Sequence, residues 1–113
     1  MRTLANKVFA GIEPFLLGDS DSPGAEHPAL IGEVLLQTLR YYRPFPTRTL
    51  GIDALYAFNR LCQRLSVEAP QYDFTEDDYA VLLTVCEWTL PRAPWFRQGP
   101  AVMDTLKAAE EKP

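Results

Sequence analysis

The chain has 113 residues, of which 47% are hydrophobic and 23% charged, and its formal net charge is −4. This length fits one domain that buries about 65% of its unfolded surface, so the core needs no metal or disulfide to hold it together. The composition is that of a folded protein, and the acidic balance argues against direct binding to nucleic acid or to an anionic membrane.

The same composition bears on localisation and on the cysteines. No segment has 18 consecutive apolar residues, and residues 1–7 lack the continuous apolar core of a signal peptide. We therefore expect a cytoplasmic protein without a membrane span. Cys62 and Cys86 lie far apart among apolar helix positions, so we expect both to be buried free thiols.

The N-terminal part predicts extended structure followed by a loop. Two apolar runs within residues 1–17, separated by Glu13-Pro14, indicate one or two short strands or an extended arm. Residues 18–26 are turn formers and predict an exposed loop. We thus expect an arm and loop over residues 1–26 and a helical part over residues 27–113, within one globular domain.

Two amphipathic helices are predicted in the middle of the chain. The first begins near His27-Pro28 and runs to about Tyr42, before the proline-rich residues 43–46. The second spans Leu50 to Leu65, with Thr49 as N-cap. The residues expected to line one face of it are Ile52, Leu55, Phe58 or Asn59, Cys62 and Leu65.

The third predicted helix has the clearest start signal. Thr75 has the position of an N-cap, and Asp78 stands at N3, where a carboxylate can reach back to the N-cap backbone. Phe74 and Tyr79 have the spacing of a hydrophobic staple, and three consecutive acids favour the positive end of the helix dipole. These features predict a helix from Glu76 to about Leu90.

A fourth helix is predicted to begin at Pro100 and to fray through residues 110–113. Four amphipathic helices joined by proline-bearing connections predict a mainly α fold. We expect a small four-helix bundle-like domain with a short N-terminal β-hairpin or an extended arm.

The residue types that carry catalysis do not gather in the sequence. His27 is the one histidine, so a histidine metal site or a catalytic triad lacks partners. The chain has no Gly-rich phosphate loop, no Cys-x-x-Cys motif and no nucleophile elbow. We therefore predict no catalytic residue, no metal, no cofactor and no enzymatic activity.

Aromatic and arginine residues beside prolines are the first candidates for a protein-binding surface. Tyr, Trp and Arg dominate binding hot spots, and loops can expose them without breaking a helix face. The alternative is that they close the ends of the bundle. The candidates are Tyr41, Tyr42, Arg43, Phe45, Trp95, Phe96 and Arg97.

Charge is distributed in blocks. Five arginines lie between Arg40 and Arg64, against Asp53 alone, and five acids without a base lie between Asp73 and Glu87. Such blocks pair within the fold or meet an opposite patch on a partner. The second candidate protein-binding group therefore consists of Asp73, Glu76, Asp77 and Asp78.

Two short motifs, Ile31-Gly32-Glu33-Val34-Leu35-Leu36 and Thr75-Glu76-Asp77-Asp78, precede a proline break and a short C-terminal helix. This layout resembles a group of small accessory proteins of tailed bacteriophages and prophages. The resemblance covers about residues 30–107, and the tryptophans and the Arg43–Thr47 segment depart from it. It implies a protein that works by contact, and it transfers no catalytic residues.

Two functions follow as predictions. The first is a non-enzymatic protein–protein interaction module, a phage or prophage accessory or assembly protein that binds itself or a host or phage component. The second is a small acidic inhibitor of a host protein such as a defence nuclease complex (anti-CRISPR-like), whose acidic group would enter a basic channel.

Overall fold

The computed structural model describes residues 1–9, 11, 16–19, 22–42 and 51–111, with the backbone alone for 16–19, 22–27, 110 and 111. The described helices are α1 (Ile31–Tyr41), α2 (Ile52–Leu65), α3 (Glu76–Thr89) and α4 (Gly99–Lys107), with 3₁₀ turns η1 (Leu90–Arg92) and η2 (Phe96–Gln98) between the last two. The described strands are β1 (Arg2–Ala5), β2 (Leu16–Asp19), β3 (Ser22–Pro28), β4 (Gln71–Phe74) and β5 (Glu110–Glu111).

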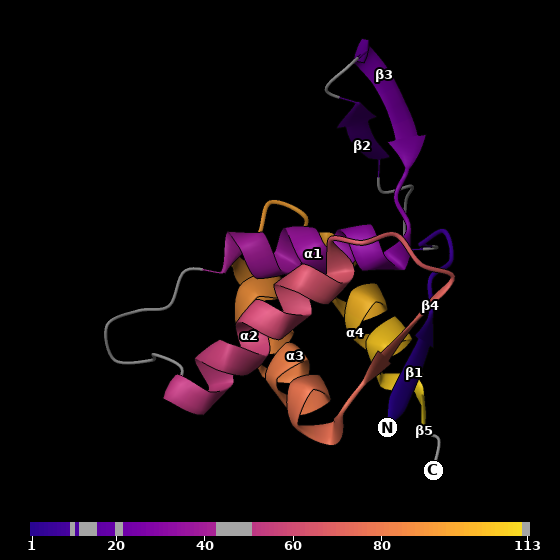
Figure 1. The fold of residues 1–113 in the computed structure, drawn as a ribbon. Helices are drawn as coiled ribbons and strands as arrows, with labels where there is room; N and C mark the ends of the chain where they lie inside the picture. The colour runs from indigo at the N-terminus through magenta and orange to yellow at the C-terminus, as the bar shows by residue number, and fades with distance from the viewer. Residues whose placement is uncertain (10, 12–15, 20–21, 43–50, 112–113) are drawn as a thin grey trace.

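The predicted fold class is confirmed at the coarse level. The described part of the chain is mainly helical, with four helices and a short N-terminal hairpin (Figure 1). A four-helix bundle as such is not confirmed, because β1, β4 and β5 form a three-stranded sheet beside the helices.

β1 is the central strand of this sheet, in the order β4-β1-β5. It pairs antiparallel with both neighbours, so that Thr3 lies opposite Asp73 on one side and Glu110 on the other. In β4, exposed and buried residues alternate, and Tyr72 and Phe74 turn into the core. The prediction that residues 110–113 fray is therefore wrong for Glu110 and Glu111, which pair with β1.

The predicted loop over residues 18–26 is wrong for residues 18–19 and 22–26, which are strand residues. β2 and β3 form an antiparallel hairpin, with an irregularity between Gly18 and Asp19, and it stands away from the helices in Figure 1. Glycine and proline are tolerated here because a two-stranded hairpin leaves half of its backbone groups at open edges.

The first helix begins later than predicted, at Ile31, whereas Pro28 ends β3. The reason is that the segment before β2 satisfies the first helical N–H groups. The Ile31 N–H donates to the Lys7 carbonyl at 2.8 Å, and the Gly32 N–H donates to Asn6 Oδ1 at 3.0 Å. Pairing to this segment, rather than the proline, sets the start of α1.

α3 begins as predicted, and α2 does not. Thr75 Oγ1 accepts the Asp78 N–H at 3.2 Å, which confirms the N-cap. α2 begins at Ile52 with Gly51 as N-cap, later than predicted, and the predicted cap Thr49 and start Leu50 lie outside the described residues.

The inner face of α2 also differs from the prediction. Ala57, Leu61 and Leu65 are buried, whereas Ile52 and Leu55 are 66% and 44% exposed. Spacings of four residues put the three buried side chains in one row, against α1 and α3. The prediction for Ile52 and Leu55 is therefore wrong.

The core contains side chains from the helices and from the three-stranded sheet. Phe74 of β4 and Tyr79 of α3, the residues with hydrophobic-staple spacing, are both buried in it. The Tyr79 hydroxyl donates to the Leu106 carbonyl of α4 at 2.7 Å. The largest fully buried side chains are Phe74, Ile31, Leu35, Leu39, Leu61, Leu82, Leu90 and Leu106, with Val34, Val85, Val102 and Thr38.

Candidate interaction surface

Two of the predicted aromatic residues, Tyr41 and Trp95, meet at the end of α1. The rings of Tyr41 and Trp95 are 5.4 Å apart between centroids, in an edge-to-face arrangement. Tyr41 is 42% exposed and Phe96, the next residue after Trp95, is 55% exposed. We call Tyr41, Trp95 and Phe96 the aromatic group. The Trp95 ring packs against the core, whereas the Tyr41 and Phe96 rings stay accessible.

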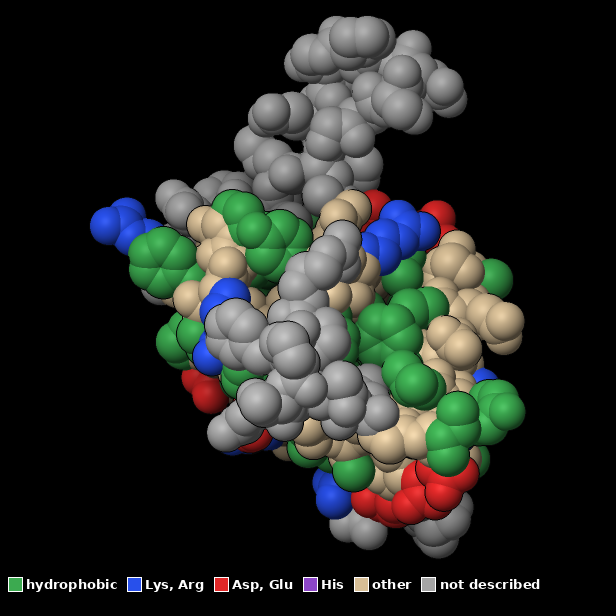
Figure 2. Space-filling view, turned by 90° about the vertical axis from the view of Figure 1, so that its left-hand side faces the viewer, with side chains coloured by type: hydrophobic (Ala, Val, Ile, Leu, Met, Phe, Trp, Pro, Cys, Tyr) green, Lys and Arg blue, Asp and Glu red, His purple; other side chains and the backbone are tan. Residues whose placement is uncertain are grey.

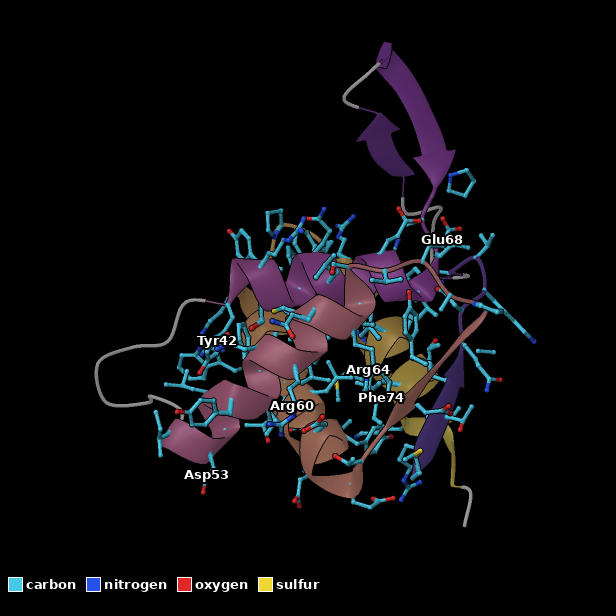
Figure 3. All side chains as sticks on the ribbon, viewed as in Figure 1. Tyr42, Asp53, Arg60, Arg64, Glu68 and Phe74 are labelled. Carbon is cyan, nitrogen blue, oxygen red and sulfur yellow. The ribbon has the colours of Figure 1, made fainter. Side chains whose placement is uncertain are left out.

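The remaining members of the predicted aromatic surface are placed differently. Tyr42 packs against Phe58 of α2, with 5.8 Å between ring centroids, so it joins two helices (Figure 3). Arg97 is exposed beside Phe96. Arg43 and Phe45 lie outside the described residues. Tyr42 is therefore largely a packing residue, as the alternative interpretation expected.

The acidic group is largely engaged within the fold. Asp78 is 2% exposed, and its Oδ1 and Oδ2 accept hydrogen bonds from Arg60 at 2.7 and 3.4 Å. Glu76 forms an ion pair with Arg2 at 3.4 Å. Asp73 Oδ1 accepts the Thr3 hydroxyl at 2.6 Å. The carboxylate of Asp78 thus meets an arginine of α2 and not the N-cap backbone. Asp77 is exposed, like Asp73 and Glu76, and its charge also acts on Arg60.

The arginine and acid blocks therefore pair across the α2–α3 contact. The hydrogen bond with Asp78 raises the pKa of Arg60 above its usual value. One turn further along α2, the Arg64 guanidinium donates to the Asp73 carbonyl of β4. Figure 3 shows both arginines on the side of α2 that faces α3 and β4. Intramolecular pairing, one of the two interpretations of the charge blocks, accounts for these residues.

The cysteines are free thiols whose surroundings do not lower their pKa. Cys86 is buried in α3, and burial raises its pKa to about 12. Burial also raises the pKa of the half-buried Cys62, although Arg40 acts in the opposite direction. A nucleophilic cysteine needs a lowered pKa, so neither thiol has the environment of one.

The outer side of α2 is a hydrophobic surface that the sequence analysis missed. Ile52, Leu55 and Tyr56 are exposed there, at the spacing of one helix face. Figure 2, viewed from the side on which α2 begins, shows hydrophobic side chains gathered on this face of the molecule. The sequence shows the spacing of Ile52 and Leu55, but the prediction places both side chains in the core.

Two clefts flank the sheet. The first, of 410 Å³, lies between β1 and α4, and among the described residues that line it Lys7 is the one with a charged side chain. The second, of 700 Å³, lies between α2 and β4 and contains Arg60, Arg64 and Asp73. The charged groups of the second cleft are those already joined by the contacts above. Neither cleft gathers carboxylates around an enclosed space.

Within the part of the chain that the structure describes, no group of three or more His, Cys, Asp or Glu side chains is placed to hold a metal ion. In the same part, none of the helices is long and apolar enough to cross a membrane. Comparison with protein-family models, with curated proteins and with solved structures gives no match. The resemblance to phage accessory proteins stays a prediction.

Proposed function

We propose that the protein is a non-enzymatic protein–protein interaction module that binds through the aromatic group. The observation that carries this proposal is the exposure of Tyr41, whose ring packs edge-to-face on Trp95, and of Phe96, the residue after Trp95. Tyr and Trp supply large contact area with few rotatable bonds, so they lose little conformational entropy on binding. The exposed Arg97, which follows Phe96 in the chain, adds a positive charge.

The biological setting that we propose is an accessory or assembly role in a tailed phage or prophage. The support is the layout of residues 31–36 and 75–78 described above. An acidic inhibitor has weaker support, because Asp78, Glu76 and Asp73 already have partners within the fold. A basic channel would have to displace those contacts before it could use the acids.

Affinity capture with a matched variant pair tests the proposal. The double variant Tyr41→Asp/Phe96→Asp places two charges in the aromatic group, and Val8→Asp places one at an equally exposed apolar position on another part of the molecule. Each protein is immobilised and exposed to a bacterial lysate, and retained polypeptides are quantified by mass spectrometry. We expect the double variant to lose bound polypeptides by about tenfold or more, while Val8→Asp retains them.

The proposal is wrong if the wild-type protein and the double variant retain the same polypeptides in the same amounts. Circular dichroism of both variants verifies that the helices are intact. Because all three positions are exposed, we expect no loss of fold from the substitutions themselves.

A further inference from the structure

We propose that the outer side of α2 binds α2 of a second copy of this chain, in antiparallel orientation, to form a two-fold symmetric dimer. This inference goes beyond the proposed function, which concerns binding through the aromatic group. It uses a different surface from the aromatic group, so the two can be tested separately.

The contact surface is a charge-free row on α2, which we call the α2 stripe. Its residues are all exposed, and each lies three or four positions from another member of the row: Ile52, Leu55, Tyr56, Asn59 and Gln63. The cores of protein interfaces are depleted of charged residues and enriched in aromatic ones. A row without charge at the surface of a helix that carries Asp53, Arg60 and Arg64 therefore has the composition of an interface core.

The charged residues of α2 lie together along one edge of the stripe. Asp53, Arg60 and Arg64 are separated by seven and four positions, and Figure 3 shows them in this order along the lower side of the helix. Arg60 is held by Asp78. The edge thus presents a negative charge near the start of α2 and a positive charge near its end.

This charge order identifies both the partner and its direction. When two copies of α2 run antiparallel with Asn59 at the centre, Asp53 of each copy lies near Arg64 of the other. A parallel pair would place Asp53 beside Asp53 and Arg64 beside Arg64, which is repulsive. Two-fold symmetry produces two copies of the Asp53–Arg64 contact, as an interface between identical surfaces requires. The exposed Arg64 would exchange or share its present bond to the Asp73 carbonyl.

The contact is short, which sets the expected strength of the dimer. A helix of 14 residues is about 21 Å long, and a single helix pair of that length buries less than a standard interface. We therefore expect a weak dimer that is populated at high protein concentration. Sedimentation velocity over about 1 µM to about 1 mM covers that range.

Charge reversal in the 113-residue chain gives the sharpest test. Asp53→Arg and Arg64→Asp each place like charges across the proposed contact, so each variant alone should dimerise at least about tenfold more weakly than wild type. The two variants are complementary to each other, so their equimolar mixture should form a heterodimer with near wild-type affinity. Asp104→Arg, the same reversal at an exposed position of α4, is the matched control and should dimerise as wild type.

The apolar part of the stripe is tested by Leu55→Glu, with Val8→Glu as control at another exposed apolar position. Leu55→Glu should abolish the dimer, and Val8→Glu should leave it intact. A wild-type chain that stays monomeric over the whole range overturns the inference, as does a dimer that survives Leu55→Glu. A mixture of the two charge variants that stays monomeric overturns the antiparallel arrangement.

Failure here is distinguishable from failure of the proposed function. Sedimentation measures the mass of complexes made by this chain alone, whereas the capture experiment measures retention of other polypeptides. If Arg64→Asp changes the circular dichroism spectrum, Asp53→Arg and Leu55→Glu still decide the inference, because neither Asp53 nor Leu55 is buried.

Discussion

At Gly32 the backbone of α1 approaches the side chain of Tyr72 too closely for any larger residue. A Cβ on Gly32 would lie 2.7 Å from Cε2 of the Tyr72 ring and 3.0 Å from Asn6 Oδ1. Neither neighbour can move without loss, because the Tyr72 hydroxyl donates to the Val67 carbonyl at 2.9 Å and Asn6 Oδ1 accepts the Gly32 N–H. Glycine is therefore required at this position for space.

We predict that Gly32→Ala destabilises the protein. Alanine is ordinarily more favourable than glycine within a helix by about 1 kcal/mol, but here the overlap with Tyr72 should lower the free energy of unfolding by about 1–3 kcal/mol. Chemical denaturation measures the change. Gly51→Ala, where a Cβ meets open space, is the control and should change stability by less than about 1 kcal/mol. Equal effects of the two substitutions would contradict the steric account.

Burial of the Cys86 thiol predicts that the protein loses stability at alkaline pH. Burial raises its pKa to about 12, while an unfolded thiol titrates near about 8.5. The folded state therefore keeps a proton that the unfolded state loses. The resulting stability is fully present below about pH 8.5 and is lost as the pH rises toward the folded pKa, with a slope that approaches about 1.4 kcal/mol per pH unit.

Denaturation between about pH 8.5 and 9.5 tests this prediction, below the pH of about 10 at which unfolded tyrosines titrate. Cys86→Ala should decline less steeply with pH than wild type, whatever its stability at neutral pH. Cys62→Ala should reduce the slope less, because that thiol is only half-buried. A slope unchanged by Cys86→Ala would show that other groups cause the alkaline loss.

At the scale of single elements, local signals predicted α3 well and α2 poorly. The N-cap at Thr75 and the acids that follow act within one turn, so the sequence contains all that is needed to start α3. Which side of α2 is buried depends on α1 and α3, and its apolar residues occupy two opposite sides. Periodicity alone predicts that Leu55 is part of the core. In the structure, α1 and α3 cover Ala57 and Leu61 instead.

The two sides of α2 predict opposite responses to the same substitution. Leu61→Ala removes a fully buried side chain and should lower the free energy of unfolding by about 2–5 kcal/mol. Leu55→Ala, six positions earlier in the same helix, should cost less than about 1 kcal/mol. Chemical denaturation of both variants measures the difference. Similar losses would mean that Leu55 is part of the core and that α2 is turned differently.

The strands show a different limit of sequence prediction. Gln71–Phe74 alternates polar and aromatic residues, so a signal for β4 was present within four residues. β5 has only two residues, and its pairing with β1 joins opposite ends of the described chain. A contact of that kind leaves no local pattern. The same limit applies to the candidate surfaces. The aromatic residues could be predicted from their residue types, whereas the exposed side of α2 can be identified only from how α2 packs on its neighbours.

At the scale of the whole molecule, the helices and the three-stranded sheet share one core, and the β2–β3 hairpin stands outside it (Figure 1). A two-stranded hairpin on its own is marginally stable in water. Local opening of the hairpin should therefore require much less free energy than opening of β1, which is paired on both sides.

Hydrogen–deuterium exchange followed by mass spectrometry tests this division. We expect peptides from β3 to exchange at least about a hundredfold faster than peptides from β1 and α3. The slow amides should exchange together, at a rate set by global unfolding. Equal protection of β1 and β3 would show that the hairpin belongs to the same cooperative unit.

The central position of β1 also constrains the order of events when the chain is made. Its first partner along the chain, β4, follows it by about 70 residues, and β5 comes later still. Until those segments leave the ribosome, β1 has no strand to join, and its backbone groups stay available to chance neighbours or to a chaperone. Assembly of the sheet therefore waits until residues 71–74 and 110–111 have been made, and contacts between such distant segments favour slow folding over fast.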